Sequence, residues 1–249
     1  MSRAFFRTLA RRAARRYPAR ERHARHFAYF KLTRDPVFRH LLESGLLVGR
    51  ERILDLGCGQ GMLEALLASV REAGGWPGDW PAPPAPRLVQ GIDVSGRDVA
   101  LAAAACDGHA TFVHGDIRTA PFPAADAIVI LDVLHYIDAA SQEAVLRRAW
   151  KALAPGGVLL LRVADGVPTL RFRITIALDR LSLRLRGGRP GAYHCRPLAE
   201  WRRRLEAIGW RIEPRPMSGG TPFANVLLVA SRPAHAAHEA ALPATGSIL

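Results

Sequence analysis

The chain of 249 residues is poor in cysteine and has no long uninterrupted apolar run. A helix that crosses a bilayer needs roughly 18 apolar residues in succession, so the sequence predicts no spanning helix. The three cysteines lie far apart and form no CxxC pair, which predicts neither a disulfide framework nor a zinc site. We therefore expect free thiols in a reducing compartment, the cytoplasm, and no bound metal.

Lysine is also scarce: Lys31 and Lys151 are the only two lysines among 35 basic residues, in a chain with a net charge of +13 and a pI near 11.1. Nine arginines and a single acid, Glu21, lie between Met1 and Arg25. An Arg-rich, acid-poor start also occurs in mitochondrial presequences, whereas no secretory apolar segment of roughly 7–15 residues follows Met1. Because arginine and alanine are favoured along the whole sequence, coding bias explains much of this composition, and we expect a bacterial cytoplasmic protein.

The N-terminal part, residues 1–44, reads as a series of basic helical segments. In the first of them, over residues 2–16, one helical stripe among arginines is formed by Phe5, Phe6, Leu9 and Ala13. Such a helix can lie on an anionic membrane surface, contact nucleic acid, or be a frayed and solvated end. If the helix lies on a membrane, the cytoplasmic protein would be in peripheral contact with the inner membrane surface. Further helices are predicted over residues 21–32 and 36–46.

From residue 45 to residue 231, short apolar runs alternate with longer helical segments. Continuous apolar runs between helices indicate a parallel sheet covered on both faces, so we expect an α/β, doubly wound domain with the N-terminal helices as a cap. A loop rich in proline and glycine, residues 74–86, is either a spacer or a lid over a site. Residues 232–249 are expected to form a disordered tail. Strands are predicted over residues 52–56, 88–93, 111–114, 127–131 and 157–163, and helices over residues 62–71, 95–106 and 141–152.

The segment Ile53–Gly61, ILDLGCGQG, joins a predicted strand to a predicted helix through three glycines. Glycine leaves room for a ligand to lie against backbone N–H groups, and the N-terminus of the helix adds partial positive charge. A dinucleotide-binding fingerprint would need glycine where Met62 stands. Asp55, at the end of the strand, would repel a pyrophosphate but suits a ligand with an amino group.

Two further acids follow predicted strands. Asp93 ends the second strand in GIDVS, where a carboxylate typically accepts hydrogen bonds from ribose hydroxyls. Asp116 follows the third strand in GDI, where it can meet an exocyclic amine. The pattern indicates a nucleoside with a charged amino-acid arm as the ligand.

These motifs, with residues 127–138 and the run LAPGGVLLL at residues 153–161, resemble in order and spacing the class I S-adenosylmethionine-dependent methyltransferases. The resemblance covers roughly residues 50–231. It implies a Rossmann-like sheet of seven strands, mostly parallel, whose last strand is antiparallel; residues 211–214 and 225–230 would be the last two strands.

The resemblance also implies S-adenosyl-L-methionine as the cofactor. The glycines would line its methionine portion, Asp93 would hold the ribose, and Asp116 with Ile117 would contact the adenine. The cofactor-binding residues expected on this basis are Asp55, Gly57, Cys58, Gly59, Gly61, Asp93, Val94, Asp116, Ile117 and Leu131.

Three other stretches, YFKLTRDPVF, YHCRPLAEW and TPFANVLLV, are similar to bacterial methyltransferases encoded beside fatty-acid and aryl-polyene synthesis enzymes. That likeness implies an aromatic or acyl acceptor, either a free small molecule or bound to a carrier.

Methyl transfer requires a base only if the acceptor must lose a proton. In LDVLHYID, His135 follows Asp132 by about one helical turn, so His135 is a candidate base; it can equally shape the pocket or contact the cofactor. Asp132 suits a cofactor or backbone contact. Tyr193 and His194 belong to residues 165–197, a segment of interleaved arginines and apolar residues. We interpret it as a cover over an acidic or amphiphilic acceptor, a membrane-contacting surface, or an ordinary helix with solvated arginines.

The sequence therefore predicts an S-adenosylmethionine-dependent methyltransferase that acts on a small-molecule or carrier-bound acceptor. An RNA methyltransferase is an alternative suggested by the pI and the Arg-rich start. No separate RNA-binding module and no Asn-Pro-Pro-aromatic motif accompany that charge, so nucleic acid is not the expected partner. A non-catalytic module that only binds the cofactor is the other alternative.

Overall fold

The computed structural model describes residues 2–185 and 191–234, which form a seven-stranded sheet in the order β3-β2-β1-β4-β5-β7-β6. The predicted disordered tail lies outside the described residues from residue 235 onward. The strands are β1 (Arg52–Leu56), β2 (Leu88–Asp93), β3 (Thr111–His114), β4 (Ala125–Leu131), β5 (Leu153–Ala164), β6 (Arg211–Pro216) and β7 (Asn225–Ser231).

Strands β1 to β5 run parallel, and β7 enters antiparallel between β5 and β6. This confirms the predicted doubly wound, mostly parallel sheet. From β1 the chain proceeds outward to β2 and β3, and then returns to place β4 on the other side of β1. Ligands of such sheets bind beyond the carboxyl ends of the strands at this point of reversal, between β1 and β4.

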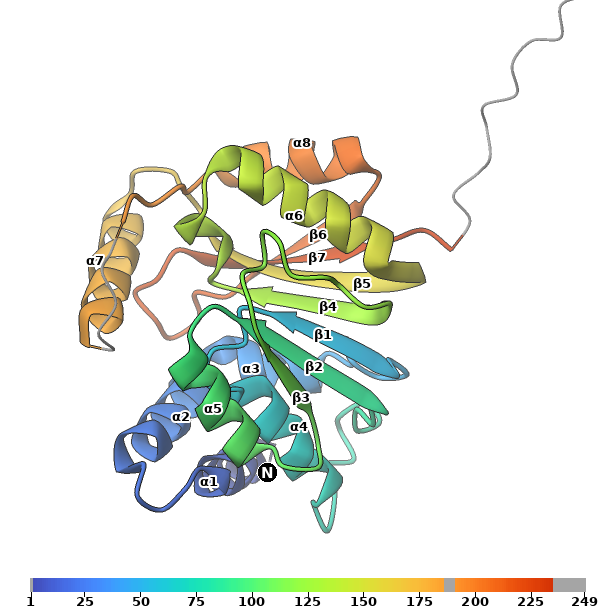
Figure 1. Cartoon of the computed structure of the whole chain (residues 1–249), viewed down its shortest axis with the longest axis vertical. Coiled ribbons are helices and arrows are strands. Elements are labelled where there is room, and N and C mark those ends of the chain that lie inside the picture. Colours follow the sequence, from blue (N-terminus) through green and yellow to red (C-terminus); the bar gives the residue numbers. More distant parts are fainter. Residues whose placement is uncertain (1, 186–190, 235–249) are drawn as a thin grey trace, which may run out of the picture.

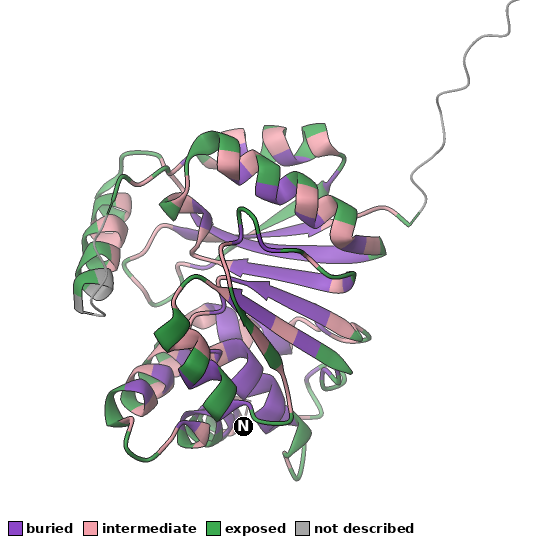
Figure 2. Ribbon diagram, viewed as in Figure 1, coloured by how far each residue is buried: buried purple, intermediate pink, exposed green. Residues whose placement is uncertain are grey.

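Helices cover both faces of the sheet (Figure 1). Helices α6 and α8 lie on one face, α3, α4 and α5 lie on the other, and α7 stands beyond the carboxyl ends of β4 and β5. Figure 2 shows the central strands almost entirely buried, as expected for a sheet covered on both sides.

Among the described helices, none combines the length and the hydropathy that a membrane span requires. The helices are α1 (Ser2–Arg16), α2 (Arg22–Arg34), α3 (Pro36–Glu43), α4 (Met62–Arg71), α5 (Gly96–Ala105), the 3-10 turn η1 (Leu134–Tyr136), α6 (Ala139–Ala152), α7 (Leu170–Leu185) and α8 (Leu198–Ile208).

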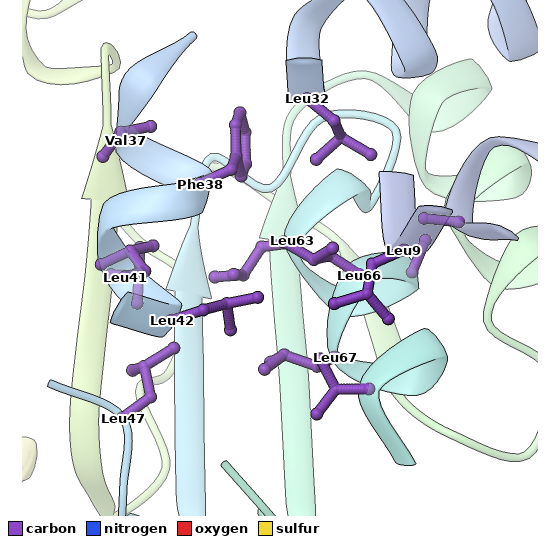
Figure 3. Close-up of a cluster of buried hydrophobic side chains, with 14 of the residues drawn as sticks. Leu9, Leu32, Val37, Phe38, Leu41, Leu42, Leu47, Leu63, Leu66 and Leu67 are labelled. Atoms are coloured by element: carbon purple, nitrogen blue, oxygen red, sulfur yellow. The ribbon is translucent and has the colours of Figure 1, made fainter. Parts of the chain in front are cut away.

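Helix α1 is packed into the core. The side chains of Phe6, Leu9 and Ala13 are buried, and Leu9 lies next to Leu66 of α4 (Figure 3). The Arg16 guanidinium donates to the Ala105 carbonyl at 2.9 Å, which ties the end of the helix to α5. The interpretation of this segment as a frayed end is therefore wrong, and its apolar stripe is not available to a membrane.

The loop at residues 74–86 packs beside α1. The rings of Trp76 and Trp80 meet edge to face with centroids 5.3 Å apart, and Phe5 packs against both. The loop ends just before Leu88, which pairs with Arg52 at the amino ends of β2 and β1. Because ligands bind at the opposite, carboxyl edge, the loop is a spacer and the lid alternative is wrong.

Candidate functional site

The glycine loop follows β1 at the carboxyl edge of the sheet and leads into α4. A Cβ atom on Gly57 would lie 2.3 Å from Val133 Cγ2, and one on Gly61 would lie 2.8 Å from Ala102 Cβ. At Gly59 a Cβ would meet nothing within 4 Å. The sequence predicted that all three glycines leave room for a ligand. In the structure Gly59 faces open space, whereas Gly57 and Gly61 are required by close packing within the protein.

Asp93 orients this loop from the tip of β2. Its carboxylate accepts hydrogen bonds from the Gly59 N–H and from the Ser95 N–H, each at 2.8 Å. Each carboxylate oxygen keeps a further lone pair, so Asp93 can still accept from a ribose hydroxyl. Val94, the next residue, is exposed, and Leu131 ends β4 at the same edge of the sheet.

Asp116 is held by a neighbour that the sequence reasoning did not single out. Its carboxylate accepts from the Arg118 backbone N–H at 2.8 Å and from the Arg118 guanidinium at 2.6 Å. These hydrogen bonds lower the pKa of Asp116, which therefore stays ionised. Ile117 beside it is buried. An adenine amine at this place would share the carboxylate with Arg118.

Asp55 is buried rather than exposed at the end of the strand. It faces Glu64 of α4, which is also buried, and a hydrogen bond between these two side chains requires a proton on one of the carboxyl groups. Burial raises the pKa of Asp55 and raises the pKa of Glu64 to about 7. The two carboxyl groups therefore hold a proton near neutral pH. Cys58 of the glycine loop is a buried thiol that interacts electrostatically with both carboxyl groups, and burial raises its pKa as well.

Asp132 belongs to a cluster of charges rather than to His135. Its carboxylate pairs with the buried guanidinium of Arg162 on β5, which also pairs with Asp35 at the start of α3. Lys31 Nζ lies 2.7 Å from the Asp35 carboxylate and 3.7 Å from that of Asp132. Although burial alone would raise the pKa of Asp35, Arg162 and Lys31 hold it well below its usual range. The prediction that Asp132 serves as the carboxylate beside His135 is wrong, because β5 supplies Asp132 with a buried cation.

The carboxylate that approaches His135 is Asp179 of α7. His135 Nε2 lies 3.5 Å from Asp179 Oδ2, which also accepts from the hydroxyls of Tyr136 and Tyr193 at 2.7 and 2.6 Å. Burial would raise the pKa of Asp179, but the nearby His135 and the hydrogen bonds from the two tyrosines lower it to about 2, so the group is anionic. The rings of His135 and Tyr193 stack with centroids 5.3 Å apart. We call His135, Tyr136, Asp179 and Tyr193 the histidine cluster.

His194 reaches this cluster only through its backbone. Its N–H donates to the His135 carbonyl at 2.9 Å, whereas its side chain is exposed. The structure thus brings together His135 and Tyr193 of the predicted catalytic residues, but not the side chains of His194 and Asp132. Asp179 was missed; its only distinguishing signal is that it is the single acid within the otherwise basic α7.

Comparison with known proteins identifies the family. Residues 4–214 match the model of a family described as a methyltransferase domain. The chain belongs to this family. The match begins within α1 and ends within β6, and it confirms the predicted class I methyltransferase and, with it, S-adenosyl-L-methionine as the cofactor.

Individual proteins resemble parts of this methyltransferase domain. The tetracenomycin polyketide synthesis 8-O-methyltransferase of Streptomyces glaucescens is 40% identical over 50 residues, which are 20% of this chain and 15% of that protein. A solved O-methyltransferase family protein from Burkholderia thailandensis superposes with a TM-score of 0.60 at 23% identity, over 86% of this chain and 60% of that one. The magnesium protoporphyrin IX methyltransferase of Synechocystis PCC 6803, solved with bound SAH, gives a TM-score of 0.55 at 22% identity, over 79% of this chain and 80% of that one. The chain thus spans less than two thirds of the length of the first two.

The methyltransferase domain offers S-adenosylmethionine a suitable set of groups. Gly59 has open space above its backbone, Asp93 presents a carboxylate beside it, and Asp116 follows on the neighbouring strand. This set has hydrogen-bond acceptors for hydroxyls and amines. Apart from the backbone N–H groups of the loop, it includes no cationic cradle of the kind that a pyrophosphate requires.

Proposed function

We propose that the methyltransferase domain transfers a methyl group from S-adenosylmethionine to a hydroxyl group of a small aromatic or acyl molecule, free or carried by another protein. The observation that carries this proposal is the histidine cluster, in which His135 has a carboxylate 3.5 Å away and an aromatic ring stacked on it. An imidazole beside an anionic carboxylate is suited to accept a proton near neutral pH.

The location of His135 supports the proposal. Val133, two residues earlier, fits against Gly57 of the glycine loop so closely that a Cβ there would clash with it. The same short connection after β4 therefore borders the cofactor loop at Val133 and carries the candidate base at His135. Tyr136 adds a partly exposed aromatic ring beside His135 against which a planar acceptor can pack, while Tyr193 is stacked on His135.

Methyl transfer to a hydroxyl group requires the protein to align the acceptor and to remove its proton. S-adenosylmethionine supplies a methyl group made electrophilic by its sulfonium, and the protein must align the acceptor oxygen with it. His135 takes the proton of the acceptor hydroxyl, and the Asp179 carboxylate stabilises the imidazolium that results. The hydrogen bonds from Tyr136 and Tyr193 keep Asp179 ionised and in place for this role.

The similar proteins favour an oxygen acceptor. One of them is named as an 8-O-methyltransferase of polyketide synthesis, and another as a member of an O-methyltransferase family. These names belong to those proteins. Applied to this chain, they support testing phenols first and hydroxylated acyl compounds second.

The test separates turnover from cofactor binding. The full chain is incubated with S-adenosylmethionine and a panel of phenols and hydroxy-acyl compounds, and S-adenosylhomocysteine is measured by mass spectrometry. We expect His135→Ala to lower turnover by about 10²–10⁴-fold, the usual contribution of a general base, with little change in cofactor affinity. Asp93→Ala should instead weaken the affinity for the cofactor, which is measured by calorimetry.

His23→Ala is the matched control, since His23 is an exposed histidine of α2 far from these contacts in sequence. It should leave turnover and affinity unchanged. Cofactor binding without turnover on any phenolic, acyl or RNA pool would reject the proposal in favour of a non-catalytic module. Turnover on RNA alone would reject the small-molecule acceptor.

A further inference from the structure

Helix α7 presents an apolar stripe to solvent. Leu170, Leu178 and Leu181 are 73%, 43% and 50% exposed, and Ala177 is exposed as well. Positions 170, 177, 178 and 181 follow the spacing that places side chains on one face of a helix. We call this stripe the outer face of α7. An exposed apolar face on a helix at the surface of a protein indicates something that covers it.

The opposite face of α7 is attached to the body of the protein. Thr175 Oγ1 accepts a hydrogen bond from the Ala224 N–H at 3.0 Å, and Asp179 accepts from Tyr136 and Tyr193. Thr175 and Asp179 are four residues apart and so share a face. Because these bonds hold the inner face, the helix cannot roll its leucines inward without breaking them.

The charges of α7 are positive and lie beside the leucines. Arg171, Arg173 and Arg184 are exposed, and by helical spacing they flank the outer face on both sides of the helix, whereas the Arg180 guanidinium lies over the Tyr193 ring. Asp179, the single acid of the helix, is turned toward the histidine cluster. The outer face therefore combines an apolar centre with cationic borders, and no carboxylate of the helix lies on it.

We propose that the outer face of α7 docks on the surface of an anionic phospholipid bilayer. A helix that lies in the interface buries its apolar face among the acyl chains near the headgroups, while arginines beside it contact the phosphates. Charge complementarity favours this occupant over a second copy of the chain. A two-fold contact through this face would bring the arginines of one α7 against those of the other.

Docking through α7 has a consequence for the acceptor. The inner face of α7 touches the histidine cluster, so a docked enzyme holds His135 directly behind the helix that lies on the lipid. An apolar acceptor dissolved in the membrane then has a short path to the site. This consequence rests on the proposed function, whereas the docking itself does not.

The test uses the full chain and vesicles of pure phosphatidylglycerol or pure phosphatidylcholine, with binding measured by co-sedimentation at low salt. We expect binding to phosphatidylglycerol only, and weaker binding as salt screens the arginines. The double variant Leu178→Asp, Leu181→Asp should lose at least about tenfold in affinity, because it replaces apolar side chains with charges that the lipid repels. Arg173→Gln and Arg184→Gln should each lose about fivefold.

The matched controls are Leu88→Asp, a leucine 66% exposed at the amino end of β2, and Arg211→Gln, an exposed arginine at the start of β6. Both should bind like the unmodified chain, and circular dichroism should show every variant folded. Equal binding to both lipids, or unchanged binding by the leucine variant, would overturn the proposal. So would a dimer that the leucine variant abolishes, without vesicle binding, since the outer face would then be an interface between copies. If vesicle binding persists but calorimetry detects no uptake of S-adenosylmethionine, the proposed function fails and the docking stands.

Discussion

At Asp55 and Glu64 the protein buries two carboxyl groups beneath the glycine loop. Burial disfavours the ionised forms, and the electrostatic interaction with Glu64 further raises the pKa of Asp55. Other ionisable groups around the pair, namely Tyr17, Cys58, Asp93 and Cys106, add no positive charge. The pair is therefore stable while it retains a proton, and ionising both groups costs free energy.

This arrangement makes stability depend on pH through Glu64. Its pKa rises from an ordinary value of 4.5 to about 7 in the folded chain, so the folded state binds the proton more tightly. The stabilisation is fully present below pH 4.5 and is lost as pH rises through about 7. Glu64→Gln cannot ionise. Between acid and alkaline pH, the unfolding free energy of this variant should fall by about 3 kcal/mol less than that of the unmodified chain. Urea unfolding across that pH range measures the difference.

Glu206→Gln provides the control, because Glu206 is half-exposed on α8 and has no comparable burial. Its stability should follow the same pH curve as that of the unmodified chain. If the Glu64→Gln curve also runs parallel to that of the unmodified chain, the shared proton does not exist.

Single residues also show the limit of prediction from sequence. Asp93 was placed at a strand tip because an apolar run ends there, and the structure agrees with that placement. Gly57 and Gly59 look identical in the motif, and only the packing of Val133 against one of them separates their roles. The partner of His135 was missed because Asp179 lies 44 residues further along the chain, on a helix whose orientation depends on tertiary contacts.

Between elements, Asp35 joins the N-terminal helices to the sheet. It caps α3 by accepting from the Val37 N–H at 3.1 Å, and it also pairs with the buried Arg162 of β5. Asp138 caps α6 in the same way, with the Ala140 N–H at 3.0 Å, but is exposed. Removing a cap costs about 1 kcal/mol, whereas removing one partner of a buried ion pair costs about 3–5 kcal/mol.

We therefore expect Asp138→Ala to lower the unfolding free energy by about 1 kcal/mol and Asp35→Ala to lower it by about 3–5 kcal/mol. Urea unfolding measures both. Asp35→Asn retains a capping oxygen but loses the charge, and should resemble Asp35→Ala more than Asp138→Ala. Equal losses for Asp35→Ala and Asp138→Ala would mean that Arg162 is adequately compensated by Asp132 alone.

Helices and strands were predicted well where the local pattern is strong. The ranges 52–56 and 62–71 match β1 and α4, because a buried apolar run and an amphipathic run are local signals. Helix α3 ends earlier than predicted, at Glu43, just before Gly45 with its positive φ of 70°. The packing of α1 was not predictable, because its apolar stripe suits lipid and protein equally. Only the tertiary structure shows that an apolar surface of α4 is available for it to cover.

Over the whole molecule, the described N-terminal helices share one hydrophobic core with the sheet. Buried side chains of α1, α2 and α3 belong to the same cluster as those of α4 and β1. Tyr17, just after α1, donates its hydroxyl to the Gln60 carbonyl of the glycine loop at 2.9 Å. The ion cluster of Lys31, Asp35 and Arg162 adds a second attachment, between the start of α3 and β5. Segments that share a core and polar anchors tend to unfold together.

We expect the chain from α1 to β7 to unfold as one cooperative unit. Native-state hydrogen exchange in increasing urea measures this, since amides that open only by global unfolding converge on one free energy. The amides of α1 should converge with those of β1 and β4, and addition of S-adenosylmethionine should raise all of them together by mass action. The amides of α7 serve as the internal reference, because that helix is exposed on its outer face and should open at a lower free energy. If α1 to α3 instead exchange at a lower free energy while the sheet stays protected, residues 1–44 form a detachable cap rather than part of the domain.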